Sequence, residues 1–174
     1  MIGIVNSALL AYAREIHGPE VWARLTTGLE PVVFVQTEDY DDRLTFELAD
    51  ALASETGLDR ETVLERVGEH FGRYIAARDF GVMIRKGSAT YRDFLLGLSE
   101  LQTRFSLIFP TVEGPRFSVE ETGPTSVTIK HFAPRTGFGP FVSGMLRGLA
   151  STFDVEARVE RFALPVEEGH GYAY

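Results

Sequence analysis

The hydrophobic pattern of this chain first changes its period near residue 110, and no other feature restricts the fold as much. Before Pro110 the apolar residues recur about every 3.6 positions, which is typical of amphipathic helices packed on a core. After Gly114 the segments 116–121 and 126–132 alternate apolar and polar residues, and a Thr-Gly-Pro turn separates them. Such alternation is typical of an antiparallel hairpin. Helices followed by an antiparallel sheet predict an α+β fold.

Apolar spacing and turn residues divide the chain into elements. The predicted helices cover residues 4–16, 19–25, 43–55, 60–78, 91–109 and 138–153. The predicted strands cover residues 116–121, 126–132 and 156–163, and residues 169–174 begin a fourth. With 174 residues, 44% of them hydrophobic, the chain suits one core. We therefore expect a single domain over 1–174, in which a helical part of about 1–110 precedes a part of about 111–174 with a twisted antiparallel sheet interrupted by one helix.

Composition and charge exclude several classes of protein. The chain has no cysteine, so it can form no disulfide, thiolate metal site or iron–sulfur cluster. Its net charge of −8 argues against binding to nucleic acid, because phosphate contacts need a basic surface. No apolar run approaches the roughly 20 residues of a membrane helix, and the N-terminal residues do not resemble a signal peptide. We therefore expect a cytoplasmic protein with no membrane contact.

Motifs of catalysis are missing from the sequence. It has no Gly-x-Ser-x-Gly nucleophile elbow and no phosphate-binding glycine loop. The acidic residues 38–42 lack the alternating pattern and the glycine of a calcium loop, so they are interpreted as helix caps. We predict that the chain is not an enzyme and has no confident metal site.

Several strings, in their order and spacing, resemble the haem–nitric oxide/oxygen-binding family, whose members are called H-NOX domains and form the sensor part of soluble guanylate cyclase. The strings are MIGIVNSAL at the start of the chain, VGEHFGRY, FLLGLSELQTRF, GPRF and IKHFAPRTGFGPFVSGMLRGLA. Together they extend the resemblance over almost the whole chain. The resemblance implies a sensory domain that binds a small molecule.

The same resemblance indicates a changed haem site. Family members carry a histidine as the axial iron ligand, and Gln102 stands at that position. Their Tyr-x-Ser-x-Arg clamp on the haem propionates corresponds to His131, Ala133 and Arg135, and Pro115 matches the proline that presses on the porphyrin. A glutamine amide is a weak iron ligand, and an alanine offers no hydrogen bond to a carboxylate. Arg135 still provides a forked, permanently charged anchor for an acid.

Apolar residues complete the site that the resemblance implies. Those expected around the cofactor are Val5, Leu64, Phe71, Ile75, Leu98 and Leu101. The same spacing also fits ordinary packing between helices, so core packing is the alternative for each of them.

Two functional hypotheses follow, and a third, a small-molecule enzyme, ranks below both. The first is a small-molecule- or gas-sensing signalling domain with lost or much weakened haem binding, whose apolar pocket takes another anionic ligand, such as a different tetrapyrrole or an apolar acid. The alternative is a true haem-based nitric oxide sensor that holds haem b through a non-standard axial ligand, with His70 or His131 as the candidates. In either case the resemblance implies a signalling protein partner of the kinase or cyclase type.

Overall fold

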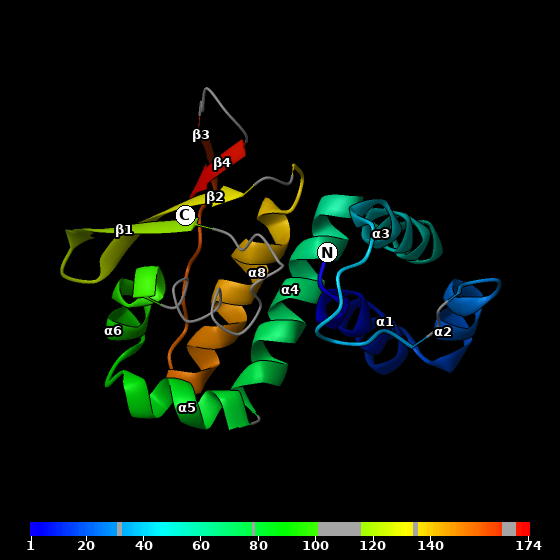
Figure 1. Ribbon diagram of the computed structural model, residues 1–174. Coiled ribbons are helices and arrows are strands. Elements are labelled where there is room, and N and C mark those ends of the chain that lie inside the picture. Colours follow the sequence, from blue (N-terminus) through cyan, green and yellow to red (C-terminus); the bar gives the residue numbers. More distant parts are fainter. Residues whose placement is uncertain (31–32, 78, 101–115, 134–135, 165–169) are drawn as a thin grey trace.

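A computed structural model describes residues 1–30, 33–77, 79–100, 116–133, 136–164 and 170–174 (Figure 1). Its helices are α1 (Gly3–His17), α2 (Pro19–Thr26), α3 (Asp42–Thr56), α4 (Arg60–Ala76), α5 (Asp79–Gly87), α6 (Tyr91–Leu96), α8 (Gly139–Ala150) and the short 3-10 helix η1 (Ser151–Phe153). Its strands are β1 (Arg116–Gly123), β2 (Ser126–Ala133), β3 (Phe162–Leu164) and β4 (His170–Ala173). Within this described part, none of the helices combines the length and the apolar character needed to cross a bilayer.

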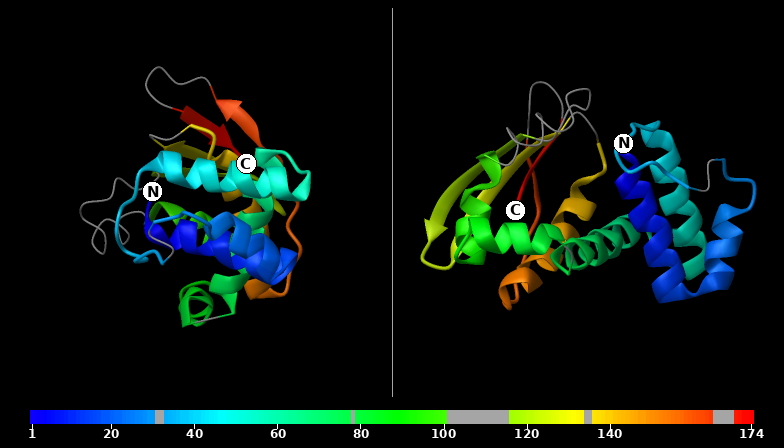
Figure 2. Two further views of the ribbon diagram at one scale, coloured as in Figure 1. Left: turned by 90° about the vertical axis from the view of Figure 1, so that its right-hand side faces the viewer. Right: turned by 60° about the horizontal axis from the view of Figure 1, so that its bottom comes forward.

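The strands form one antiparallel sheet, which confirms the predicted α+β fold. Their order is β1-β2-β4-β3, so that β1 and β3 are the edges. Helix α8 lies between β2 and β3 in the sequence, as expected for a sheet interrupted by one helix. Figures 1 and 2 show α4 and α8 side by side through the middle of the molecule, with α1 to α3 on one side and the sheet with α6 on the other.

Buried side chains form two core clusters, one on each side of this central helix pair. The helical cluster joins α1, α3 and α4 and includes the fully buried Leu9, Leu52 and Val63. The sheet cluster joins α6, α8 and the inner face of the strands, and it includes Phe94 and Ile129. Partly buried Phe138 and Met145 pack against both clusters. The sheet and the N-terminal helices are therefore connected mainly through α4 and α8.

Four glycines allow α4 and α8 to cross at very short range. Gly68 and Gly72 lie one turn apart on α4, and Gly144 and Gly148 lie one turn apart on α8. A Cβ atom added to Gly144 would overlap the carbonyl oxygen of Glu65, and one added to Gly148 would overlap a carbonyl oxygen of α4 in the same way. The backbones themselves are thus in contact, which is the geometry that small residues four positions apart permit.

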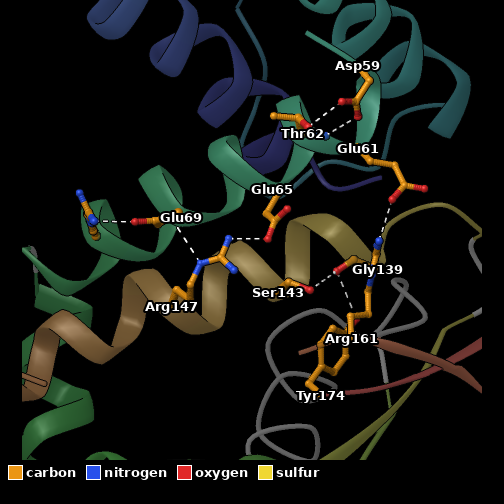
Figure 3. Close-up of polar contacts among 11 residues, drawn as sticks. Asp59, Glu61, Thr62, Glu65, Glu69, Gly139, Ser143, Arg147, Arg161 and Tyr174 are labelled. Carbon is orange, nitrogen blue, oxygen red and sulfur yellow. Dashed lines mark hydrogen bonds and ion pairs between the residues drawn. The ribbon is translucent and has the colours of Figure 1, made fainter. Parts of the chain in front are cut away.

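Ion pairs border this crossing. The Arg147 guanidinium of α8 lies 2.5 Å from a carboxylate oxygen of Glu65 and 3.5 Å from one of Glu69 (Figure 3). Glu69 also pairs with Arg73 at 2.5 Å. These groups are partly exposed, so the pairs orient the two helices more than they stabilise them.

Local signals placed most element ends correctly. Asp41 accepts a hydrogen bond from the backbone N–H of Arg43 at the start of α3, and Gly57 ends that helix with a φ of 70°. The Asp59 carboxylate caps α4 through the N–H of Thr62 at 2.8 Å. The hydrogen bonds that the backbone N–H and the hydroxyl of Thr62 donate to Asp59 lower the pKa of this carboxyl, because they favour its charged form.

Three predicted elements differ from the structure. The helix expected over 60–78 ends at Ala76, and a separate helix, α5, follows it. The helix expected over 91–109 is interrupted at Gly97, after which residues 98–100 are helical again and residues 101–109 lie outside the described part. The strand expected over 156–163 pairs with β4 only from Phe162 onward.

Substituting Gly144→Ala should destabilise the protein by about 1–3 kcal/mol or more, because the added Cβ atom meets backbone that cannot move away without separating α4 from α8. Gly87→Ala is the matched control, since nothing lies within 4 Å of its added Cβ atom. Urea unfolding monitored by circular dichroism measures both changes. Equal unfolding midpoints for the two variants would contradict the close crossing.

Candidate functional site

Part of the predicted site lies outside the described residues. This applies to Leu101, Gln102, Pro115 and Arg135, and also to the side chains of Ile75 and Ala133. Their assignment to a ligand site remains a prediction. The structure places the other candidates, which are Val5, Leu64, Phe71, His70, Leu98 and His131.

His131 is enclosed among aromatic rings on the inner face of the sheet. Its side chain is 2% exposed, and its ring stacks on Phe117 of β1 with centroids 5.1 Å apart and an interplanar angle of 21°. On the other side its Nδ1 lies 3.4 Å from the hydroxyl oxygen of Tyr174. Burial lowers the pKa of His131 to about 4, because the charged form loses its hydration. The imidazole is therefore neutral at pH 7.

The surroundings of His131 connect the sheet to the first turn of α8. The Tyr174 hydroxyl also donates a hydrogen bond of 3.3 Å to the carbonyl oxygen of Gly139 (Figure 3). Gly139 is buried against the ring of Tyr172, and an added Cβ atom would lie 2.9 Å from that ring. Burial raises the pKa of the Tyr174 phenol, so this hydroxyl remains protonated. His131 thus belongs to a packed, uncharged aromatic group.

The apolar candidates are divided between the two cores. Val5, Leu64 and Phe71 are 6%, 1% and 6% exposed in the helical cluster, whereas Leu98 belongs to the sheet cluster. All four are packed against protein side chains, so the structure does not bring them together as one group. Their role in lining a ligand pocket remains a prediction.

Phe138 and Phe141 form an aromatic stack beside Phe71. Phe141 of α8 lies 5.6 Å from Phe71 between ring centroids, and it stacks on Phe138 at 4.5 Å. Pro140 between them is fully buried. The spacing of Phe138 and Phe141, three residues apart at the start of a helix, is the signal that could have indicated this cluster.

His70 lies at a small recess between α1 and α4. The recess has a volume of about 50 Å³ and is lined by Ile4, Ser7, Ala8, Ala11, Gln36, His70, Phe71 and Tyr74. The Nε2 atom of His70 lies 3.2 Å from a carboxylate oxygen of Glu15, which is an ion-pair distance without hydrogen-bond geometry. The ring also packs edge-on against Tyr12 at 5.6 Å. Such a volume holds a few water molecules, whereas a ligand of drug size needs roughly 300 Å³ or more.

No metal centre of ordinary composition is present in the part of the chain that the structure describes. Its histidine, aspartate and glutamate side chains form no group of three that could hold an ion. Among the described residues, burial shifts the pKa of both His131 and Tyr174, which contact each other.

Comparison with known proteins supplies the family context. The sequence model of the HNOB family, described as Haem-NO-binding, matches residues 2–161. The soluble guanylate cyclase gcy-31 of Caenorhabditis elegans is 24% identical over 163 residues, which are 92% of this chain and 23% of that protein. Soluble guanylate cyclase 89Da of Drosophila melanogaster is 21% identical over 88% of this chain and 23% of its own length. The chain thus spans about a quarter of the length of these curated relatives.

Solved H-NOX structures share the fold. An unliganded Fe(II) H-NOX mutant from K. algicida superimposes with a TM-score of 0.81 at 20% identity, over 99% of this chain and 94% of that chain. A variant of Cs H-NOX gives a TM-score of 0.85 at 17% identity, with the same two coverages. An H-NOX protein from S. oneidensis in its Fe(II)NO state gives 0.81 at 15% identity, over 99% of this chain and 97% of that chain. At these identities the likeness shows the fold alone.

Because His131 is buried, the stability of the folded protein should depend on pH in a specific way. Its pKa is about 4 in the folded protein and about 6.5 in the unfolded chain, so the unfolded chain binds more protons between these values. Stability should be unaffected by His131 above about pH 6.5 and should decrease as the pH falls toward 4, by up to about 1.4 kcal/mol per pH unit. Urea unfolding at several pH values measures this slope.

The variant His131→Phe tests the assignment, because phenylalanine keeps the ring contact with Phe117 and cannot titrate. Its stability should depend less steeply on pH across the same range. An identical slope in the two proteins would mean that another group titrates.

Proposed function

Because the chain belongs to the Haem-NO-binding family, we propose that it is a sensory domain for a small molecule or gas whose haem binding is lost or much weakened. The observation that carries the proposal is His131. It stands where family members carry the tyrosine of the haem clamp, and it is enclosed and neutral between Phe117 and Tyr174. A buried neutral imidazole that already faces a tyrosine hydroxyl is poorly placed to hold a propionate.

The donor set fits haem poorly. Gln102 offers only an amide oxygen to iron, and Ala133 offers no hydrogen bond where the family has a serine. Replacing hydroxyls that bond a carboxylate removes about 1.5–3 kcal/mol for each hydrogen bond. Of the three clamp positions only Arg135 keeps the family residue.

The site residues that still match the family fit another acidic ligand with an apolar body better than they fit haem. The Arg135 guanidinium can bind a carboxylate through two parallel hydrogen bonds. Pro115 and the apolar candidates would supply the rest of the contact. A tetrapyrrole other than haem, or a smaller apolar acid, has this chemistry.

We further propose that residues 1–174 act as one domain and that a separate signalling protein of the kinase or cyclase type, or an attached one, receives the signal. The close contact of α4 with α8 supports a single unit, because these helices belong to the helical part and the sheet-containing part, respectively. The matched relatives carry the name soluble guanylate cyclase, which supports a cyclase as one type of output. We propose no catalytic role for the domain itself.

The alternative, a haem-based nitric oxide sensor with His70 or His131 as axial ligand, has less support. His70 contacts Glu15 at a recess of about 50 Å³, and His131 is covered by aromatic rings. Addition of haem distinguishes the two hypotheses.

The purified protein mixed with haemin should retain no intense absorption band at about 400 nm after gel filtration. The combined variant Gln102→His, His131→Tyr and Ala133→Ser should retain one, because it restores an imidazole ligand and both hydroxyls. Glu20→His, an added histidine on the exposed face of α2, is the control and should behave as the unmodified protein. A stable band in the unmodified protein would contradict the proposal and favour the alternative.

Arg135→Ala should weaken the binding of iron-free protoporphyrin by roughly tenfold or more, since a charged hydrogen bond contributes about 1.5–3 kcal/mol. Arg66→Ala removes the same charge from an exposed position of α4 and should leave the affinity unchanged. Fluorescence titration measures both dissociation constants. Equal losses in the two variants would indicate a general effect of charge and would remove Arg135 from the site.

A further inference from the structure

The recess between α1 and α4 has an apolar interior. Ile4, Ala8 and Ala11 recur at helical spacing on α1 and line one side of it, and Phe71 and Tyr74 of α4 line the other. Figure 1 shows α1 beside α4, on the side away from the sheet. The two alanines leave the space open, because a larger side chain at either position would fill it. Small residues on α1 opposite large residues on α4 thus produce the recess.

Contacts around the recess hold its walls in place. The Phe71 ring packs against Phe141 of α8, with ring centroids 5.6 Å apart. The backbone N–H of Ile4 donates a hydrogen bond of 3.2 Å to the carbonyl oxygen of Gln36, which lines the recess between α1 and α4. The recess therefore does not need an occupant to keep its shape.

A carboxylate lies at one end of the recess. Glu15 follows Ala11 by about one turn on the same side of α1. One of its carboxylate oxygens lies 3.2 Å from the Nε2 atom of His70, a residue that lines the recess. That nitrogen is buried and makes no hydrogen bond, so His70 does not satisfy the carboxylate. Among the described residues no arginine or lysine pairs with Glu15, whose side chain is 57% exposed.

An apolar recess beside an unpaired carboxylate selects a particular kind of ligand. Water molecules in the recess find few hydrogen-bond partners on its apolar walls, so an alkyl group that displaces them gains affinity. A volume of about 50 Å³ admits only a short chain. A cationic group at the end of that chain can donate charge-assisted hydrogen bonds to Glu15. An anionic group at the same place would be repelled.

We propose that the recess between α1 and α4 binds a free primary amine with a short aliphatic chain. The chain lies against Ala11 and Phe71, and the ammonium group donates hydrogen bonds to the carboxylate of Glu15. This inference goes beyond the acidic ligand proposed above and does not depend on it, because Ala11 and Glu15 are not among the residues assigned to that ligand.

Titrations of the full chain with small probes test the proposal, with the methyl NMR signals of Ile4, Ala8 and Ala11 as the readout. n-Butylammonium chloride should shift these signals and bind about fivefold more tightly than n-butanol, which is the upper range for the contribution of an exposed ion pair. Methylammonium keeps the charge and lacks the chain, so it should bind at least about tenfold more weakly than n-butylammonium. Butyrate should not bind, because its charge has the same sign as that of Glu15.

Two variants separate the carboxylate from the apolar walls. Glu15→Gln should lower the affinity for n-butylammonium about fivefold and leave that for n-butanol unchanged, whereas the control Glu20→Gln, at an exposed position of α2, should change neither. Ala11→Leu should prevent both probes from binding, because the larger side chain fills the recess. Its matched control is Ala51→Leu on the exposed face of α3, which should bind both probes normally.

Three outcomes would overturn the proposal. Equal affinities for n-butylammonium and n-butanol would remove Glu15 from the site. Unchanged methyl signals at a high concentration of n-butylammonium would mean that the recess does not accept an aliphatic chain. Tighter binding of Nα-acetyl-lysine methylamide than of n-butylammonium would exclude a free amine as the ligand and would assign the recess to a lysine side chain of another polypeptide.

Discussion

The contact between the bare backbones of α4 and α8 is the constraint on which the rest of the structure depends. Gly68 and Gly144 remove the side chains that would otherwise keep the two helices about 8–10 Å apart. Glycine lowers the stability of an isolated helix, and here the tertiary contact between the helices offsets that cost. The helical cluster forms on one side of the pair and the sheet cluster on the other. Separation of the two helices would therefore expose both cores.

The sheet depends on this helix pair through aromatic contacts. Tyr172 packs on Gly139 at the start of α8, and Tyr174 bonds both to the carbonyl oxygen of Gly139 and toward His131. His131 is therefore packed as part of the sheet core. The His131 ring already contacts other side chains of the protein, so this polar residue at a clamp position need not contact a ligand.

Local signals in the sequence predicted the fold well, and contacts between distant segments account for the errors. The caps at Asp41 and Asp59 and the αL glycine at Gly57 act within a few residues, so the ends of α3 and α4 were close to their predicted positions. The strand expected over 156–163 is paired only from Phe162, and this pairing with β4 joins segments that local alternation cannot relate. His131 lies in the predicted strand 126–132, but the alternation of that strand could not show that Phe117 and Tyr174 enclose the ring. For Gln102 and Arg135 the family resemblance is still the basis of the assignment.

The glycine crossing also has a mechanical consequence. At most helix interfaces a small displacement is absorbed by side chains that change rotamer, but Gly68, Gly72, Gly144 and Gly148 have none to change. A shift of α4 on the side of the N-terminal helices must therefore displace α8, and with it Gly139 and the tyrosines of the sheet. The positions of the two cores are therefore coupled through backbone contact and not through adjustable side chains.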